Sequence, residues 1–279
     1  MRKLIVTADD FGAAVEVNQA IERAHRDGIL SAASLMVAAP AAQDAVMRAK
    51  AMPDLRVGLH LVLVEGKPVL PAAAVPLLVD STGNFHTNMA RAGAAVFFRL
   101  AVRRQLEEEI AAQFEAFRAT GLALDHINAH KHFHLHPTIA KMIVKFARLF
   151  GVKGARVPLE PRSVLACIEP CRASGIAALT RPFALELRRN FRRAGMVVPD
   201  QVFGLAWSGA MTSARLTGLV ENLPEGLSEI YLHPAMGPYP GSAPGYRYRE
   251  ELSALMDCRL PSLIVASGIK TGGFSDFIG

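Results

Sequence analysis

The N-terminal quarter of the chain repeats one local pattern, in which a short apolar run is followed by an amphipathic helical stretch. The apolar runs occupy residues 2–12, 31–40 and 56–66. The stretches between them, 15–28 and 41–53, carry apolar side chains at helical spacing. This alternation of strands and helices is typical of a parallel sheet built from crossover connections.

The same alternation continues toward the C-terminus. Helical patterns at 103–121 and 137–151 flank an apolar run that carries histidines at 124–130, and further strand-like runs lie at 152–160 and 227–237. We therefore expect about six to eight strands in an α/β fold, arranged as a distorted (β/α) TIM-like barrel. A doubly wound open sheet is the alternative.

Two segments interrupt the alternation. Residues 66–104 begin with a weakly patterned stretch that carries proline and glycine, and we expect a long loop there. Residues 163–210 are apolar and rich in arginine, which favours one or two helices, and 267–274 has the composition of a turn. Because the chain has no internal repeat or linker, we predict that residues 1–279 form one barrel domain with these two segments as insertions at its rim.

Acids, histidines and an arginine stand where the predicted strands end. An unpaired buried charge costs several kcal/mol, so such residues persist where they pair with one another or with a metal. The carboxyl ends of barrel strands meet at one face, where active sites of such barrels lie. The residues are Asp9, Asp10, His60, His126, Asn128, His130, Arg156 and His233. We expect a functional site at this face.

Asp10, His60 and His130 form a set that suits a divalent metal. One carboxylate and two imidazoles from three strands would leave positions open for water. Each residue also has an ordinary alternative, because an aspartate after a strand often caps a helix and a histidine in an apolar run is often a core residue. The three together favour a metal site, with Zn²⁺ or Mg²⁺ as the candidate ion.

Three further residues have candidate catalytic roles beside such a metal. Asp9 could act as a general base while Asp10 holds the ion, provided that the strand turns into a loop at this point. Arg156 could hold Asp9 ionised, and His233 could protonate a leaving group. A plain salt bridge for Arg156 and a turn position for His233 are the alternatives.

The segment "LDHINAHKHFHLHP" carries histidines only at even positions, and these share a face only while the chain stays extended. Pro137 predicts the start of a helix, so we expect the strand to end near His130 and a loop to follow. A histidine-rich metal tract is the alternative. The candidate substrate-binding residues are His126, Asn128, His132 and His134.

The formal net charge of +6 indicates an anionic partner. Residues 92–104 and 176–193 combine apolar faces with arginines, which suits interfacial helices on anionic lipid and leaves a peripheral membrane contact open. Core-facing helices with a solvated basic face are the alternative. We do not expect nucleic acid as a partner, because the sequence lacks aromatic residues interleaved with basic ones.

The cysteine count and the N-terminus bear on the cellular compartment. Cys167, Cys171 and Cys258 are too few for a disulfide framework, so we expect reduced thiols. The chain begins directly with a strand pattern, which favours a cytoplasmic protein. No apolar run reaches the roughly 18 residues that a bilayer span needs.

The motifs at these positions resemble those of the YdjC/ChbG-like family of carbohydrate deacetylases. They are "TADDFG" at 7–12, "GLHL" at 58–61, "DHINAHKHFHLHP" at 125–137 and "EIYLHPAMG" at 229–237, in the family's order over most of the chain. The resemblance implies a distorted barrel that hydrolyses N-acetyl groups of amino sugars with a divalent metal. It also implies Asp10, His60 and His130 as metal ligands and Asp9 as the base. By similarity to polysaccharide deacetylases, it implies Arg156 as the support of the base and His233 as the acid.

Within this family the chain resembles the hopanoid-biosynthesis-associated deacetylases, through "AHRDGILSAASLMV", "VGLHLVLVEG" and "INAHKHFHLHPT". This resemblance implies an N-acetylglucosaminyl-hopanoid lipid as the substrate. One position departs from the broader family, in which many members carry an acid two residues before the last histidine ligand. Asn128 stands there, and its amide could instead hydrogen-bond a ligand histidine.

Other functions remain open at this point. The chain could deacetylate water-soluble chito-oligosaccharides, or it could be a metal-dependent hydrolase of another bond, such as a phosphoester. Phosphoesterases often hold two metals about 3.5–4 Å apart. A catalytically silent lipid- or glycan-binding protein is the third possibility.

Overall fold

Strand β1 is the centre of a parallel sheet in the computed structural model, which describes residues 1–170 and 175–278. The sheet order is β5-β4-β3-β2-β1-β7-β6, and β8 pairs with the first half of β1. The strands are β1 (Arg2–Phe11), β2 (Ala32–Leu35), β3 (Arg56–Leu61), β4 (His126–Ala129), β5 (Gly154–Ala155), β6 (Gln201–Phe203), β7 (Gly226–Leu232) and β8 (Lys270–Thr271). This sheet curls into a half-barrel, so the expected distorted (β/α) barrel is confirmed.

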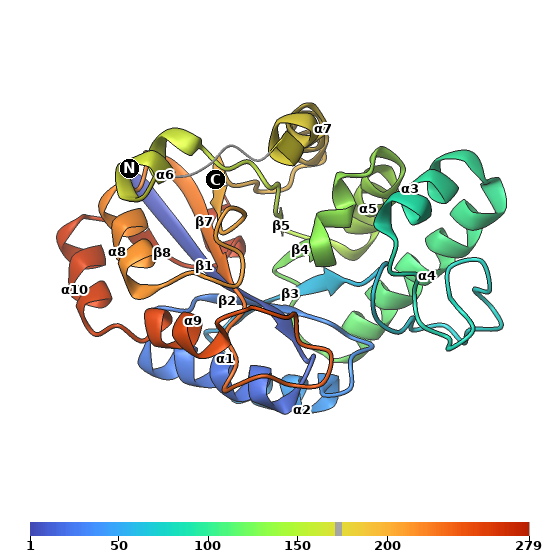
Figure 1. Cartoon of the computed structure of the whole chain (residues 1–279), viewed down its shortest axis with the longest axis horizontal. Coiled ribbons are helices and arrows are strands. Elements are labelled where there is room, and N and C mark those ends of the chain that lie inside the picture. Colours follow the sequence, from blue (N-terminus) through green and yellow to red (C-terminus); the bar gives the residue numbers. More distant parts are fainter. Residues whose placement is uncertain (171–174, 279) are drawn as a thin grey trace.

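Helices surround the sheet on its outer side. Figure 1 shows α1 and α2 on one side of the sheet, with α8 to α10 at one end and α3 to α5 at the other. The helices are α1 (Val15–Asp27), α2 (Ala42–Lys50), α3 (Met89–Phe98), α4 (Leu100–Ala119), α5 (Pro137–Phe150), α6 (Arg162–Ile168), α7 (Gly175–Arg193), α8 (Ser213–Glu221), α9 (Tyr248–Leu255) and α10 (Arg259–Ala266), with short 3₁₀ turns η1 (His130–Leu135) and η2 (Ser275–Phe277). No helix in the described part of the chain is both long and apolar enough to cross a bilayer.

Local sequence explains where the helices around the histidine segment begin and end. Helix α5 has Pro137 in its first turn, where a proline loses no helical hydrogen bond, and His136 caps it. Its C-terminus is Gly151, whose φ of 67° lies in the left-handed region that glycine adopts readily. The predicted order of strand end, loop and helix is therefore confirmed.

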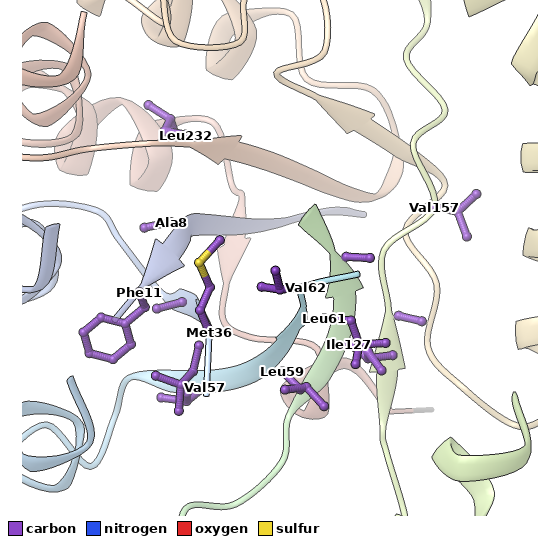
Figure 2. Close-up of a cluster of buried hydrophobic side chains, with 14 of the residues drawn as sticks. Ala8, Phe11, Met36, Val57, Leu59, Leu61, Val62, Ile127, Val157 and Leu232 are labelled. Atoms are coloured by element: carbon purple, nitrogen blue, oxygen red, sulfur yellow. The ribbon is translucent and has the colours of Figure 1, made fainter. Parts of the chain in front are cut away.

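The core between the sheet and the helices supports the polar residues at the strand ends. Figure 2 shows Leu59 and Leu61 of β3 close to Ile127 of β4, whereas Val57 lies toward Phe11 and Met36. These side chains are nearly inaccessible to solvent. Because they lock neighbouring strands in register, the polar residues that follow them are held in fixed relative positions.

Several local predictions need correction. The run at 152–160 forms only the two-residue strand β5, and the predicted turn at 267–274 contains strand β8. Strand β6 lies inside the second predicted rim insertion, and the region 92–104 is two helices rather than one. These strands are too short to show an alternating pattern, and their backbones pair because the neighbouring strands fix them.

The two cysteines in the described part of the chain are not buried structural thiols. Cys167 and Cys258 are free and exposed. Cys171 lies outside the described residues. The two described thiols agree with the expected reduced state, and their exposure means that they contribute little to the core.

Candidate active site and metal centre

A cavity of about 920 Å³ opens at the carboxyl ends of the strands. Six of the ten predicted site residues line it, namely Asp9, Asp10, His60, His130, His132 and His233. All four tyrosines of the chain line it too, at positions 231, 239, 246 and 248. Six of the polar residues at or after the strand ends and all four tyrosines therefore converge on one cavity.

Asp10, His60 and His130 lie together at the floor of this cavity. Each offers one ligand atom, and the three atoms lie within 4.8 Å of one another. Asp10 Oδ1 is 3.4 Å from His60 Nε2 and 3.4 Å from His130 Nδ1. Asp10 Oδ1 and His60 Nε2 are buried and have no hydrogen-bond partner. Since buried polar atoms are normally paired, these orphaned atoms fit a bound cation.

The electrostatics of Asp10 also suit a cation site. Burial alone would raise the pKa of Asp10, but the imidazoles of His130 and His60 outweigh it and hold the pKa well below its usual value. The carboxylate is therefore ionised at neutral pH, as a metal ligand must be.

The backbone is strained around this centre. Asp10 has a φ of 63°, in the left-handed region, and the pairing of β1 with β2 is irregular between Ala8 and Phe11. Regular strand geometry would send adjacent side chains to opposite faces, so this twist allows Asp9 and Asp10 to line the same cavity. The other non-glycine residues of positive φ in the described ranges, Glu65, Lys131 and His132, line the cavity as well. Such strain commonly marks functional sites.

Asn128 lies behind the cluster of Asp10, His60 and His130 and does not line the cavity. Its Oδ1 accepts a hydrogen bond from His60 Nδ1 at 2.7 Å, and its Nδ2 donates to Asp9 Oδ1 at 3.0 Å and to Ser34. An amide oxygen can only accept, so Nδ1 of His60 carries a proton, and Nε2 is the ring nitrogen that faces Asp10. The structure thus favours the alternative role for Asn128, a hydrogen bond to a ligand histidine, over substrate contact.

Asp9 lies beside His60 and pairs with Arg156. The two terminal nitrogens of Arg156 donate to the carboxylate, Nη1 to Oδ2 and Nη2 to Oδ1, the latter at 3.0 Å. Burial alone would raise the pKa of Asp9, but the charge of Arg156 and, to a lesser extent, that of His60 lower it well below its usual value. Asp9 is therefore a carboxylate of fixed orientation that is ionised near neutral pH and can accept a proton.

Arg156 is fully buried and reaches Asp9 from behind the cavity wall. Its Nε and Nη2 also donate to Glu229 Oε1, at 2.9 and 2.7 Å, and Thr7 donates to the same oxygen at 2.9 Å. The guanidinium lies 4.3 Å from the centre of the Tyr231 ring. Two carboxylates and an aromatic face therefore fix its position.

Sequence reasoning missed Glu229. A signal was present, because Glu229 and Tyr231 alternate with apolar residues on β7, on the face that leads to His233. An acid in a fully buried strand needs a partner, and Arg156 supplies it.

His233 follows β7 and sits among tyrosines. Its ring contacts Tyr231 and Tyr246, with centroids 5.7 and 5.2 Å apart. Its backbone N–H donates to Glu251 Oε2 at 2.5 Å, and its Nδ1 is buried without a partner. The buried carboxylate of Glu251, also missed from sequence, thus ties the loop after β7 to α9. An imidazole held in this way can exchange a proton with a group in the cavity.

The loop histidines have unequal positions. His132 lines the cavity and its Nε2 lies 3.0 Å from the Tyr231 hydroxyl. Burial lowers the pKa of His132 well below its usual value, so this ring is neutral. His134 is buried and donates to the backbone oxygen of Arg156 at 3.1 Å, and it does not line the cavity. It supports Arg156 rather than facing a ligand.

His126 does not line the cavity either. Its Nδ1 donates to Asp125 at 2.9 Å, its Nε2 accepts from Ser34 at 3.0 Å, and its ring stacks on Phe274 at 4.4 Å. Both ring nitrogens are occupied and the residue is fully buried. The predicted substrate contact is replaced by a core position, because His126 is the first residue of β4, at the opposite end of the strand from the cavity.

Comparisons with known proteins identify relatives of this chain. The sequence profile of the family described as "YdjC-like protein" matches residues 3–266. A carbohydrate deacetylase of Geobacillus stearothermophilus is 31% identical over 99% of this chain and 98% of its own, and one of Vibrio cholerae is 32% identical over 99% and 96%. The crystal structure of a putative cellobiose-phosphate cleavage protein from Enterococcus faecalis superposes with a TM-score of 0.78, at 25% identity, over 100% of this chain and 99% of that one.

These findings confirm the expected family, fold and enzyme class, a hydrolase acting on carbon–nitrogen bonds. The relatives match along nearly the full length of the chain, so the likeness includes every strand that contributes to the cavity. The chain belongs to the YdjC-like protein family.

Proposed function

We propose that this chain is a metal-dependent N-deacetylase of an amino-sugar conjugate. The observation that carries the proposal is the cluster of Asp10, His60 and His130 ligand atoms, within 4.8 Å of one another, beside the paired carboxylate of Asp9. Zn²⁺ is our preferred ion over Mg²⁺, because two of the three ligands are imidazoles. A divalent ion at this site would lower the pKa of a water molecule and polarise the acetamide oxygen.

The residues of the chain would then divide the proton transfers. Asp9, held by Arg156, would take the proton of the attacking water. His233 would deliver a proton to the sugar nitrogen as the carbon–nitrogen bond breaks, giving acetate and a free amine. Tyr231 and Tyr246 flank His233 and would keep its ring at the angle needed for this transfer.

The cavity composition supports an amino sugar with an apolar aglycone. Tyrosine faces such as those of Tyr239 and Tyr248 suit the apolar faces of a sugar ring. Farther along the cavity, Phe133, Leu165 and Leu185 provide apolar lining. We propose an N-acetylglucosaminyl lipid, of the hopanoid class, met by a cytoplasmic enzyme at the inner face of the membrane.

The test is acetate release by purified protein. We expect release from an N-acetylglucosaminyl lipid in detergent, its loss with chelator, and its return with Zn²⁺. Asp9→Asn should abolish release, whereas Asp54→Asn, at an exposed aspartate, should not. No release from any N-acetylated amino sugar by the Zn²⁺-loaded protein would refute the proposal. Faster release from chito-oligosaccharides than from the lipid would refute only the lipid-linked substrate.

A further inference from the structure

The junction of α3 and α4 exposes large apolar side chains. Phe97, Phe98 and Leu100 are 50%, 79% and 60% exposed. Arg99 separates the two helices with an extended backbone, at φ −111° and ψ 111°. Neither proline nor glycine stands at this break, so the local sequence does not force it. We refer to residues 97–100 as the elbow.

The elbow is a built feature rather than a frayed helix end. Arg103 donates from Nε to the backbone oxygen of Val96 at 2.9 Å and from Nη2 to that of Phe97. The ring of Phe97 lies 6.2 Å from that of His136 between centroids, and His136 Nε2 donates to the Gly93 oxygen at 3.1 Å. These contacts hold the apolar side chains outward in a fixed position, where water is a poor solvent for them.

The elbow adjoins the apolar part of the cavity. His136 lines the cavity, as does Met89 at the start of α3. Helix α7 packs on α5 and η1 and contributes Leu185 and Arg188 to the cavity lining, and it exposes Phe183 (47%). Figure 1 shows α5 between α7 and α3. All three phenylalanines that are exposed in the described residues therefore lie on the two helices that flank this end of the cavity.

Charge identifies the partner of this surface. Residues 89–104 carry four arginines and no acid, for a net charge of +4. Residues 175–193 carry five arginines and one glutamate, also +4. Since the whole chain carries +6, the remainder is net negative and the positive charge is concentrated here. Exposed aromatic rings within a basic surface match a bilayer that contains anionic lipid. The same charge would repel a second copy of this surface.

We propose that the elbow and α7 dock on an anionic phospholipid bilayer and place the cavity against it. The aromatic rings of Phe97 and Phe98 would enter the interface while Arg99 and Arg104 meet lipid phosphates. The biological reason for docking rests on the lipid-linked substrate proposed above, but the docking itself does not need that substrate. A substrate anchored in the bilayer would then reach the cavity without leaving the membrane.

The test is co-sedimentation of purified protein with phosphatidylcholine vesicles, with and without phosphatidylglycerol. We expect binding that requires phosphatidylglycerol and weakens as salt increases. Phe97→Ser/Phe98→Ser should weaken binding roughly tenfold or more. Val265→Ser on α10, whose valine is 79% exposed at the far end of the molecule, is the matched control and should bind as wild type does. Arg99→Gln/Arg104→Gln should reduce the dependence on phosphatidylglycerol.

Thermal unfolding and acetate release from a water-soluble substrate should match wild type in all these variants, which shows that the fold and the catalytic residues are intact. Absence of vesicle binding, or equal loss in Val265→Ser and in the phenylalanine variant, would overturn the proposal. So would self-association through the phenylalanines, seen by analytical ultracentrifugation. Vesicle binding without any deacetylase activity would leave this proposal standing and refute the proposed function alone.

Discussion

Replacing Arg156 by methionine should move the pH dependence of catalysis. The distance from Arg156 Nη2 to Asp9 Oδ1 is 3.0 Å. At an effective dielectric constant of about 20, two unit charges at this distance attract by about 5.5 kcal/mol, which corresponds to about 4 pKa units. Burial raises the pKa of Asp9, and the charge of Arg156 is the largest effect that lowers it. Without Arg156 the pKa of Asp9 should therefore rise.

The sign of the effect on activity follows from the role of Asp9 as a base. A base is active above its pKa, so raising that pKa makes activity fall at a higher pH as the solution is acidified. We expect the acid limb of kcat/KM in Arg156→Met to lie at least roughly 2 units above that of the wild type, because water entering the space will screen part of the full Coulomb value. Acetate release measured across the pH range gives both limbs.

Stability must be separated from catalysis in this experiment. Arg156→Met leaves Asp9 and Glu229 buried without their partner, which should reduce the free energy of unfolding by about 3–5 kcal/mol. Adding Glu229→Gln removes one of the two uncompensated charges and should restore part of that loss without restoring the acid limb. If the acid limb stays at its wild-type pH in a folded Arg156→Met protein, while Asp9→Asn is inactive, Arg156 does not control the ionisation of Asp9.

Three further predictions follow from neighbouring contacts. Asn128→Ala should weaken Zn²⁺ binding about 10–100-fold in a chelator competition, because His60 loses the acceptor that fixes its tautomer; unchanged affinity would contradict this. The metal-free Asp10→Gly protein should unfold with a free energy about 1 kcal/mol greater than Asp10→Ala, because φ is 63° at this position; equal stabilities would remove the backbone argument. Burial and Arg156 lower the pKa of His134 from 6.5 to about 3, so the unfolded chain binds an extra proton between these pH values and stability falls as pH decreases through them. Between pH 6.5 and pH 4 the free energy of unfolding should drop roughly 3 kcal/mol more in the wild type than in His134→Gln. Urea titration of the metal-free proteins measures this difference. An equal drop in the two proteins would show that His134 does not titrate in this way.

Much of the fold and the convergence of Asp10, His60 and His130 could be predicted, because those features depend on periodicity. Strands β1, β3 and β7 are long enough to show their apolar runs, and their ends place Asp10, His60 and His233 at one edge of the sheet. The two-residue strands β5 and β8 show no such pattern. Strand β5 pairs with β4 at the end of the sheet order, and β8 pairs with Lys3 and Leu4 of β1, before the point where β1 meets β2. Periodicity thus identifies residues that meet at one face but says little about short segments that pair with a sheet already formed.

The hydrogen-bonded residues behind the cavity could be predicted less well, because their roles depend on depth along a strand. His126, Asn128 and His130 share one face of the histidine segment, yet only His130 lies beyond the end of β4 and reaches the cavity. Asn128 lies one step deeper and bonds to His60, and His126 lies deeper still against Phe274. A strand rises about 3.3 Å per residue, so a separation of two residues moves a side chain by more than the length of a hydrogen bond.

The backbone after His130 could not be predicted from side-chain alternation at all. Lys131 and His132 both adopt left-handed conformations, which non-glycine residues rarely take, and this turn directs His132 toward Tyr231 while His134 reaches Arg156. His134 therefore holds Arg156, which pairs with Asp9, and His132 holds Tyr231, whose ring lies against Arg156. In the proposed mechanism the histidine-rich segment thus supplies one metal ligand, His130, and further residues that support the base, Asp9. Replacing one of these supporting residues should alter pH dependence or stability before it alters metal content.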